Sequence, residues 1–213
     1  MFVKVPKILQ NFFPKIVWRH KTHEKKIWLT FDDGPDEKTT NLILEILKKL
    51  NIKATFFLIG QEIKKFPDLT KKIIDDGHTL GNHSFSHTDG FRTKKEKYVY
   101  DVELNQKLIN EKLVESGISK KQKLFRPPYG RILPNQFNEL SKQYKIIMWD
   151  VFSWDFKENL SKKRLQKNVL NNVKPGSIIV FHNNKKSYNN LFCCLEKILI
   201  SLKKMDYSFS TTW

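Results

Sequence analysis

Short apolar runs alternate with longer amphipathic stretches along the whole chain, and this alternation limits the fold more than any other feature. The short runs are rich in β-branched and aromatic residues, and the longer stretches place leucine and isoleucine at helical spacing. Seven strands are expected, at residues 27–31, 54–60, 78–81, 123–126, 145–149, 177–182 and 207–210. Six helices are expected between them, at residues 39–50, 63–74, 94–116, 134–144, 161–170 and 191–202. This alternation predicts an α/β fold with a parallel sheet, either an open wound sheet or a closed barrel, and the pattern alone does not separate the two.

The length of the chain suits one compact domain. Its 213 residues include sixteen Phe and five Trp, enough for a single core, so extended disorder is excluded. We expect residues 26–213 to form the domain and residues 1–25 to pack on it as an N-terminal strap. Lys and Pro interrupt every apolar run of that segment, so neither a signal peptide nor a transmembrane segment is expected. The localisation stays open between the cytoplasm and the cell envelope.

The chain is strongly basic, with 39 Lys and Arg against 22 Asp and Glu and a net charge of +17. A charge of this size is one signature of nucleic-acid binding. Only five of the cations are arginines, however, and arginine supplies the two-pronged contacts with which proteins read bases. An abundance of Lys, Asn and Ile is also typical of proteins encoded by AT-rich genomes. We therefore expect no nucleic-acid partner.

Polar side chains follow the predicted strands, at the end where parallel α/β folds place their sites. Asp32 and Asp33 end the first strand ahead of a Gly-Pro turn, where two carboxylates can bind a metal and transfer a proton. Alone, this pair is better explained as an ordinary Asp-Gly turn in which one Asp caps the next helix. His83 and His87 follow the third strand four residues apart, so both imidazoles face the same point. Two imidazoles and one carboxylate leave an open coordination position, as in catalytic zinc centres, so we favour a metal site at Asp33, His83 and His87.

Three more clusters follow later strands. Residues 126–130 (RPPYG) contain two prolines, which fix the backbone and free the Tyr129 amide to donate to an oxyanion. Residues 149–156 (WDVFSWDF) supply aromatic faces of the kind that pack on sugar rings, although core packing explains them as well. His182 ends a strand among clustered acids, which makes it a candidate general acid. The histidines without such partners are expected to be structural or exposed (His20, His23 and His78).

In this order, the motifs TFDDGP, HSFSH, RPPYG, WDVFSWDF and IVFH resemble the five motifs of the NodB-type polysaccharide deacetylases, carbohydrate esterase family 4. The first two are highly specific together, and the match covers nearly all the chain beyond its N-terminal segment. The resemblance implies a distorted (β/α) barrel of about seven parallel strands, with its site at their carboxyl ends. It implies a hydrolase that removes N-acetyl groups from the N-acetylhexosamine units of a polysaccharide and uses one divalent metal. Zn²⁺ is the expected metal, with Co²⁺, Ni²⁺ and Mn²⁺ as alternatives.

The resemblance also assigns roles by motif position. Asp32 matches the general base, and Arg126 matches the arginine that orients it. His182 matches the general acid, and Asp155 matches the acid that pairs with that histidine. Tyr129 matches the residue whose amide helps to bind the oxyanion. The expected metal ligands are Asp33, His83 and His87, and the expected substrate-binding residues are Pro127, Tyr129, Trp154 and Phe156.

Three positions depart from the family pattern and bear on the substrate. Phe152 stands where an acid is frequent, Phe156 where a Trp is frequent, and Asn183 where an Asp is frequent. These changes leave every expected metal ligand and proton-transfer group in place, but they change the sugar cleft. Peptidoglycan N-acetylglucosamine is the first substrate expected, with chitin oligosaccharides or xylan as alternatives. A non-catalytic carbohydrate-binding relative is the rival interpretation, and a monomer is expected.

Overall fold

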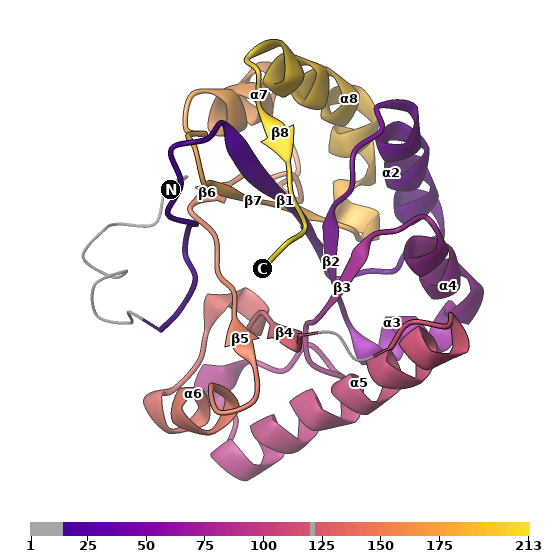
Figure 1. Ribbon diagram of the computed structural model, residues 1–213, viewed down its shortest axis with the longest axis vertical. Helices are drawn as coiled ribbons and strands as arrows, with labels where there is room; N and C mark the ends of the chain where they lie inside the picture. Colours follow the sequence, from indigo (N-terminus) through magenta and orange to yellow (C-terminus); the bar gives the residue numbers. More distant parts are fainter. Residues whose placement is uncertain (1–14, 120–121) are drawn as a thin grey trace.

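The computed structural model describes residues 15–119 and 122–213, and these residues form an incomplete barrel with its helices on the outside (Figure 1). One parallel sheet contains the strands in the order β5-β4-β3-β2-β1-β7-β6, with β8 beside β1. The strands are β1 (Lys26–Asp32), β2 (Thr55–Leu58), β3 (Thr79–Asn82), β4 (Leu124–Phe125), β5 (Lys145–Ile146), β6 (Val151–Phe152), β7 (Ile178–His182) and β8 (Ser208–Phe209). The α-helices are α2 (Glu37–Lys49), α3 (Gly60–Lys65), α4 (Pro67–Asp75), α5 (Lys95–Glu115), α6 (Pro134–Leu140), α7 (Lys162–Leu170) and α8 (Tyr188–Lys204). Three short 3₁₀ turns complete the chain, η1 (Gly90–Arg92), η2 (Pro128–Gly130) and η3 (Lys185–Ser187).

The central strand β1 sets the position of the site. All of its residues after the first are buried, as expected for a parallel strand that is covered on both faces. Its last residue, Asp32, is in register with Phe57 of β2 and with His182 of β7. At the same edge Asn82 of β3 is in register with Phe125 of β4. The residues that follow these strands therefore gather at one end of the barrel.

The barrel is open between β5 and β6, the two ends of the strand order, and the N-terminal segment lies beside this opening (Figure 1). Val17 forms a parallel bridge with Ile147, and Arg19 forms an antiparallel bridge with Ser177. Residues 1–14 of the predicted strap lie outside the described residues, so the strap at 1–25 stays a prediction.

The C-terminal residues enter the barrel from the end opposite the site. The indole N–H of Trp213 donates to the hydroxyl of Thr55, at the start of β2, over 3.0 Å. The indole N–H of Trp28 donates to the carbonyl of Thr212 over 2.8 Å. In the part of the chain that the structure describes, no helix is both long enough and apolar enough to span a membrane.

The predicted alternation and the distorted barrel are confirmed, with two local corrections. The helix predicted at 63–74 is two helices, because Pro67 lacks an N–H and disfavours helical backbone at Phe66 (φ −129°, ψ 63°). The strand β6 (Val151–Phe152) was not predicted, since two residues inside an aromatic run carry no periodicity.

Candidate active site

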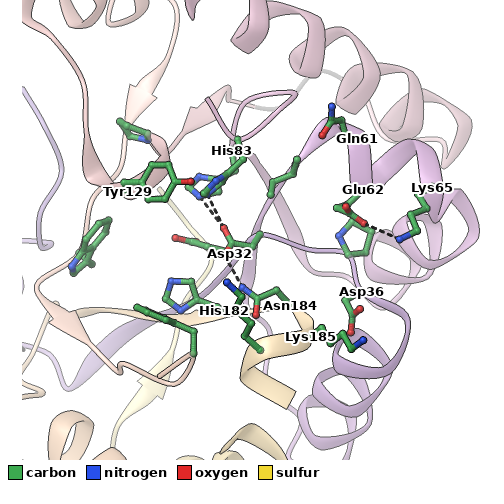
Figure 2. A pocket seen from close by; sticks show the side chains of 18 of the residues that line it. Asp32, Asp36, Gln61, Glu62, Lys65, His83, Tyr129, His182, Asn184 and Lys185 are labelled. Carbon is green, nitrogen blue, oxygen red and sulfur yellow. Dashed lines mark hydrogen bonds and ion pairs between the residues drawn. The ribbon is translucent and has the colours of Figure 1, made fainter. Parts of the chain in front are cut away.

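A cleft of about 720 Å³ opens at the carboxyl ends of the strands (Figure 2). The sequence-predicted residues Asp32, Asp33, His83, His87, Pro127, Tyr129, Phe156 and His182 all line it. Arg126 and Asp155 are fully buried next to it and contact lining residues. Side chains from β1, β7 and the loops after β3 and β4 thus meet in one cavity, although their motifs lie far apart in the sequence.

The predicted metal ligands come together in this cleft. Oδ1 of Asp33 lies 3.3 Å from Nε2 of His83 and 3.2 Å from Nε2 of His87. One donor atom of each residue lies within 4.8 Å of the other two. Burial favours a raised pKa for Asp33, but its contacts with the two imidazoles hold that pKa well below its usual range. The carboxylate is therefore ionised at neutral pH, as a metal ligand must be.

The tautomer of His83 also suits a metal site. Its Nδ1 lies 2.7 Å from the carbonyl oxygen of Arg126, so the ring donates its proton there and leaves Nε2 free as a ligand. A carboxylate and two imidazoles with converging donor atoms form a donor set that fits a divalent metal ion.

The loop that carries the two histidines is fastened to α5 by Asp101. Its carboxylate accepts hydrogen bonds from the backbone N–H groups of Phe85 (3.0 Å) and Ser86 (3.1 Å). It also accepts from the hydroxyls of Ser86 (2.7 Å) and Thr88 (3.0 Å). His87, in the same loop, has a left-handed backbone (φ 55°), which costs free energy for any residue except glycine. Sequence reasoning missed Asp101, because an acid on an amphipathic helix is ordinarily solvent-exposed.

Asp32 is held by a fully buried arginine. Nη1 of Arg126 donates to Oδ1 of Asp32 over 2.7 Å and to the hydroxyl of Thr30 over the same distance. Its Nη2 donates to the carbonyl of Met148 over 2.9 Å, and its guanidinium lies 4.2 Å from the centre of the Phe57 ring. Burial lowers the pKa of Arg126 and the charge of Asp32 raises it, and an arginine with such a partner stays protonated. The guanidinium therefore fixes the direction of the Asp32 carboxylate.

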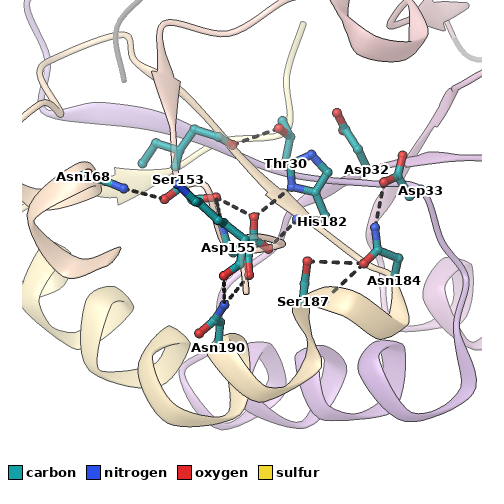
Figure 3. A network of polar contacts seen from close by, with 12 residues as sticks. Thr30, Asp32, Asp33, Ser153, Asp155, Asn168, His182, Asn184, Ser187 and Asn190 are labelled. Atoms are coloured by element: carbon teal, nitrogen blue, oxygen red, sulfur yellow. Dashed lines mark hydrogen bonds and ion pairs between the residues drawn. The ribbon is translucent and has the colours of Figure 1, made fainter. Parts of the chain in front are cut away.

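His182 is paired with Asp155 beneath the cleft (Figure 3). Nδ1 of His182 lies 2.8 Å from Oδ1 of Asp155, and the backbone N–H of His182 donates to Oδ2 over 2.8 Å. The hydroxyl of Ser153 donates to the same carboxylate over 2.7 Å. Burial opposes the charged imidazole, but attraction to Asp155, and more weakly to Asp33 and Asp32, raises the pKa of His182 to about 9. His182 is therefore protonated at neutral pH.

Tyr129 lines the cleft and has a left-handed backbone conformation (φ 58°). Among residues 15–119 and 122–213, no acceptor is hydrogen-bonded to its backbone N–H. Its ring packs edge-on against His87, with the ring centres 4.5 Å apart, and stays 60% exposed. A free N–H next to the metal-ligand cluster is a suitable donor to an oxyanion.

Aromatic side chains form one wall of the cleft. Trp149, Phe152 and Phe156 line it, and Phe156 lies 4.8 Å from His182 between ring centres. Trp154, predicted to bind substrate, is not among the lining residues and packs against Phe152, 4.7 Å away between ring centres. Its backbone is left-handed (φ 65°), which interrupts the period of two that would place it on the same side as Phe152 and Phe156.

Asn184 joins two parts of the site and was not predicted. Its Nδ2 donates to Oδ2 of Asp33 over 2.8 Å, and its Oδ1 accepts from the backbone N–H of Ser187 over 3.2 Å (Figure 3). The turn η3 is thereby tied to a metal ligand. The available signal was position, since Asn184 lies two residues after the motif that ends in His182.

Comparison with known proteins supports one family. Residues 19–148 match the sequence profile of the family described as polysaccharide deacetylase. A peptidoglycan-N-acetylglucosamine deacetylase of Bacillus cereus is 37% identical over 191 residues, which are 89% of this chain and 67% of that protein. The chain belongs to the polysaccharide deacetylase family, within carbohydrate esterase family 4.

Solved structures share the fold. The crystal structure of the Bc1960 peptidoglycan N-acetylglucosamine deacetylase superposes with a TM-score of 0.84 at 33% identity, over 91% of this chain and 88% of that chain. BA3943, described as a CE4 family pseudoenzyme from Bacillus anthracis, superposes with a TM-score of 0.78 at 25% identity, over 90% of this chain and 65% of that chain. Since one of these relatives is a pseudoenzyme, the fold alone does not establish turnover, and the residues of the site must carry that argument.

Proposed function

We propose that this chain removes the acetyl group from N-acetylglucosamine units of peptidoglycan, in a hydrolysis that depends on a divalent metal. One observation carries the proposal: the buried base Asp32, the acid His182 and the cluster of Asp33, His83 and His87 all line one cleft. The pairing of base with Arg126 and of acid with Asp155 supports a catalytic site and not a binding-only relative.

The proposed metal is Zn²⁺, held by Asp33, His83 and His87, with Co²⁺, Ni²⁺ and Mn²⁺ as alternatives that the same donors accept. When bound, such an ion supplies Lewis-acid polarisation of the amide carbonyl and lowers the pKa of water. The protein supplies the ligands, their orientation through the Arg126 carbonyl, and the groups that move protons.

The proton transfers are assigned to Asp32 and His182. Asp32, held by Arg126, accepts the proton of the attacking water as the oxygen adds to the acetyl carbon. The backbone N–H of Tyr129 donates to the developing oxyanion. His182 then donates its proton to the amide nitrogen as the C–N bond breaks, which releases acetate and leaves a free amine on the sugar. Asp155 keeps His182 protonated until this step.

The substrate follows from the relatives and from the cleft. The Bacillus cereus relative and Bc1960 are named peptidoglycan N-acetylglucosamine deacetylases, and the wall formed by Trp149, Phe152 and Phe156 suits the apolar face of a sugar ring. Chitin oligosaccharides, which carry the same N-acetyl group, and xylan, which carries acetyl esters open to the same hydrolysis, stay as alternatives. We place the enzyme at the cell envelope, where peptidoglycan is found, and propose that it acts as a monomer without a nucleic-acid partner.

Acetate release from peptidoglycan and from chitin oligosaccharides, measured before and after chelation and after Zn²⁺ is restored, tests this function. We expect chelation to abolish release and Zn²⁺ to restore it, with peptidoglycan as the better substrate. The variant Asp32→Asn should lose at least about a hundredfold in kcat while it still binds one metal, because only the base is removed. Asp68→Asn, an exposed acid on α4, is the matched control. Unchanged kcat in Asp32→Asn would contradict the proposed base.

A further inference from the structure

We infer that Lys185 and Lys186 form an anion subsite at the mouth of the cleft, which binds a carboxylate or phosphate carried by the glycan near the acetylated sugar. The inference rests on the proposed function, since it concerns the substrate of the same cleft. It gives the two lysines a role in choosing acidic over neutral glycans.

The first observation is that both lysines line the cleft and lack an anionic partner. They belong to η3, and both side chains are exposed. Within 15–119 and 122–213, no carboxylate lies within ion-pair distance of either ammonium group. Lys65, the remaining lysine of the lining, is 3.9 Å from Glu62. Lys185 and Lys186 are thus the lining lysines that are available to a ligand.

The nearby acids form no ion pair with these two lysines and have other partners. Asp36, which Figure 2 shows beside Lys185, caps α2 and accepts hydrogen bonds from the backbone N–H and the hydroxyl of Thr39, over 2.9 and 2.6 Å. Asp33 contacts His83 and His87, and Asp32 forms an ion pair with Arg126. The ammonium groups of Lys185 and Lys186 are therefore available to an anion that enters the cleft.

The second observation is that the lysines stand on a fixed piece of backbone. Asn184 begins η3, and its side chain accepts from the N–H of Ser187 and donates to Asp33. Its carbonyl oxygen lies 3.0 Å from the hydroxyl oxygen of Thr39, and Ser187 is fully buried. The backbone of the lysine pair is therefore held at a constant distance from the metal ligand Asp33, while the ammonium groups can adjust to the ligand. Such an arrangement favours a substrate whose anionic group lies at a particular distance from the reacting acetyl group.

Peptidoglycan offers an anion of this kind. The sugar next to each N-acetylglucosamine carries an ether-linked carboxyl group, either free or extended by a peptide that has carboxylates of its own. Phosphate substituents on the glycan are a second source of the same charge. Chitin oligosaccharides share the acetylated sugar and lack both. Lysine, a flexible point charge, suits either anion.

The test compares neutral, carboxylated and phosphorylated oligosaccharides of equal length on the wild type and on Lys185→Gln/Lys186→Gln. With the carboxylated or the phosphorylated substrate we expect KM to rise about three- to twentyfold in the double variant, the sum of two exposed ion pairs. With the neutral substrate KM should stay within twofold, and kcat should stay unchanged with all three. The anionic substrate whose KM rises more in the double variant identifies the source of the charge. Raising the salt concentration should remove the difference between wild type and variant.

Lys203→Gln/Lys204→Gln is the matched control, because it removes the same charge from an adjacent pair of exposed lysines at the far end of α8. An equal change with neutral and acidic substrates, no change with any, or the same change in the control overturns the inference. Binding of each oligosaccharide, measured by calorimetry on the same proteins, separates this result from failure of the proposed function. If the wild type releases no acetate from any substrate, the function is wrong, and the binding measurement still decides the anion subsite.

Discussion

Nη1 of Arg126 lies 2.7 Å from Oδ1 of Asp32, and the arginine side chain is fully buried. The same guanidinium donates to Thr30 and to the carbonyl of Met148. The guanidinium is therefore held by contacts with the barrel strands and loops in addition to its contact with Asp32. This gives the Asp32 carboxylate one set direction, which is what a base acting on a single water requires.

Replacing Arg126 by Lys should lower kcat about a hundredfold and leave metal content unchanged, because an ammonium group cannot reproduce the fork that holds Asp32. We also expect about 1–3 kcal/mol less free energy of unfolding, since carbonyls that accept from Arg126 lose their donors. Steady-state kinetics, metal analysis and urea unfolding measure the three quantities. Arg164→Lys, on the exposed face of α7, is the control. A kcat within twofold of wild type would show that Arg126 does not position the base.

Much of this site was predictable from sequence, because its main residues end a strand or lie in the loop that follows one. Asp33, His83 and His182 meet through the register of parallel strands, which the alternation of runs already implied. Asp101 and Asn184 were not predictable in the same way. They act through hydrogen bonds to loop backbone and to a ligand, and these contacts depend on how loops fold and not on local periodicity. The direction of the Trp154 side chain was not predictable for a related reason, since it depends on a left-handed backbone (φ 65°) just after the short strand β6.

Asp155→Asn should move the alkaline limb of the activity profile to lower pH. His182 must be protonated to donate to the leaving nitrogen, and Asp155 is the main attraction that raises its pKa to about 9. Removing that charge lowers the pKa, so the proton is lost earlier as the pH rises. The pH dependence of kcat/KM measures the shift. Glu158→Gln, an exposed acid of the same loop, should leave the profile in place, and an unshifted limb in Asp155→Asn would contradict the pairing.

Asp101→Asn should weaken metal binding about ten- to a hundredfold, the range found when a group that supports metal ligands is changed. An amide can accept only at its oxygen, so some of the four hydrogen bonds to the histidine loop are lost. Competition with a chromophoric chelator gives the affinity, and the visible spectrum of the Co²⁺ form reports the ligand geometry. Glu103→Gln removes the same charge from the exposed face of α5 and should change neither. If Asp101→Asn kept the wild-type metal affinity and Co²⁺ spectrum, Asp101 would not influence the metal ligands.

Acid should destabilise the fold through His78, a residue outside the cleft. His78 is buried, accepts a hydrogen bond from the backbone N–H of Ala54 at Nδ1 over 3.2 Å, and has its pKa lowered by burial from 6.5 to about 4. The unfolded chain binds a proton at His78 as the pH falls below about 6.5, whereas the folded chain does so only near 4. The free energy of unfolding should therefore fall by about 1.4 kcal/mol per pH unit in that window from this group alone. Urea unfolding between pH 7 and about pH 4.5 should show a smaller slope in His78→Gln, whatever its stability at neutral pH. His23→Gln, at an exposed histidine, is the control and should leave the slope of unfolding free energy against pH unchanged. Equal slopes in His78→Gln and wild type would show that the buried imidazole is already charged in the native state.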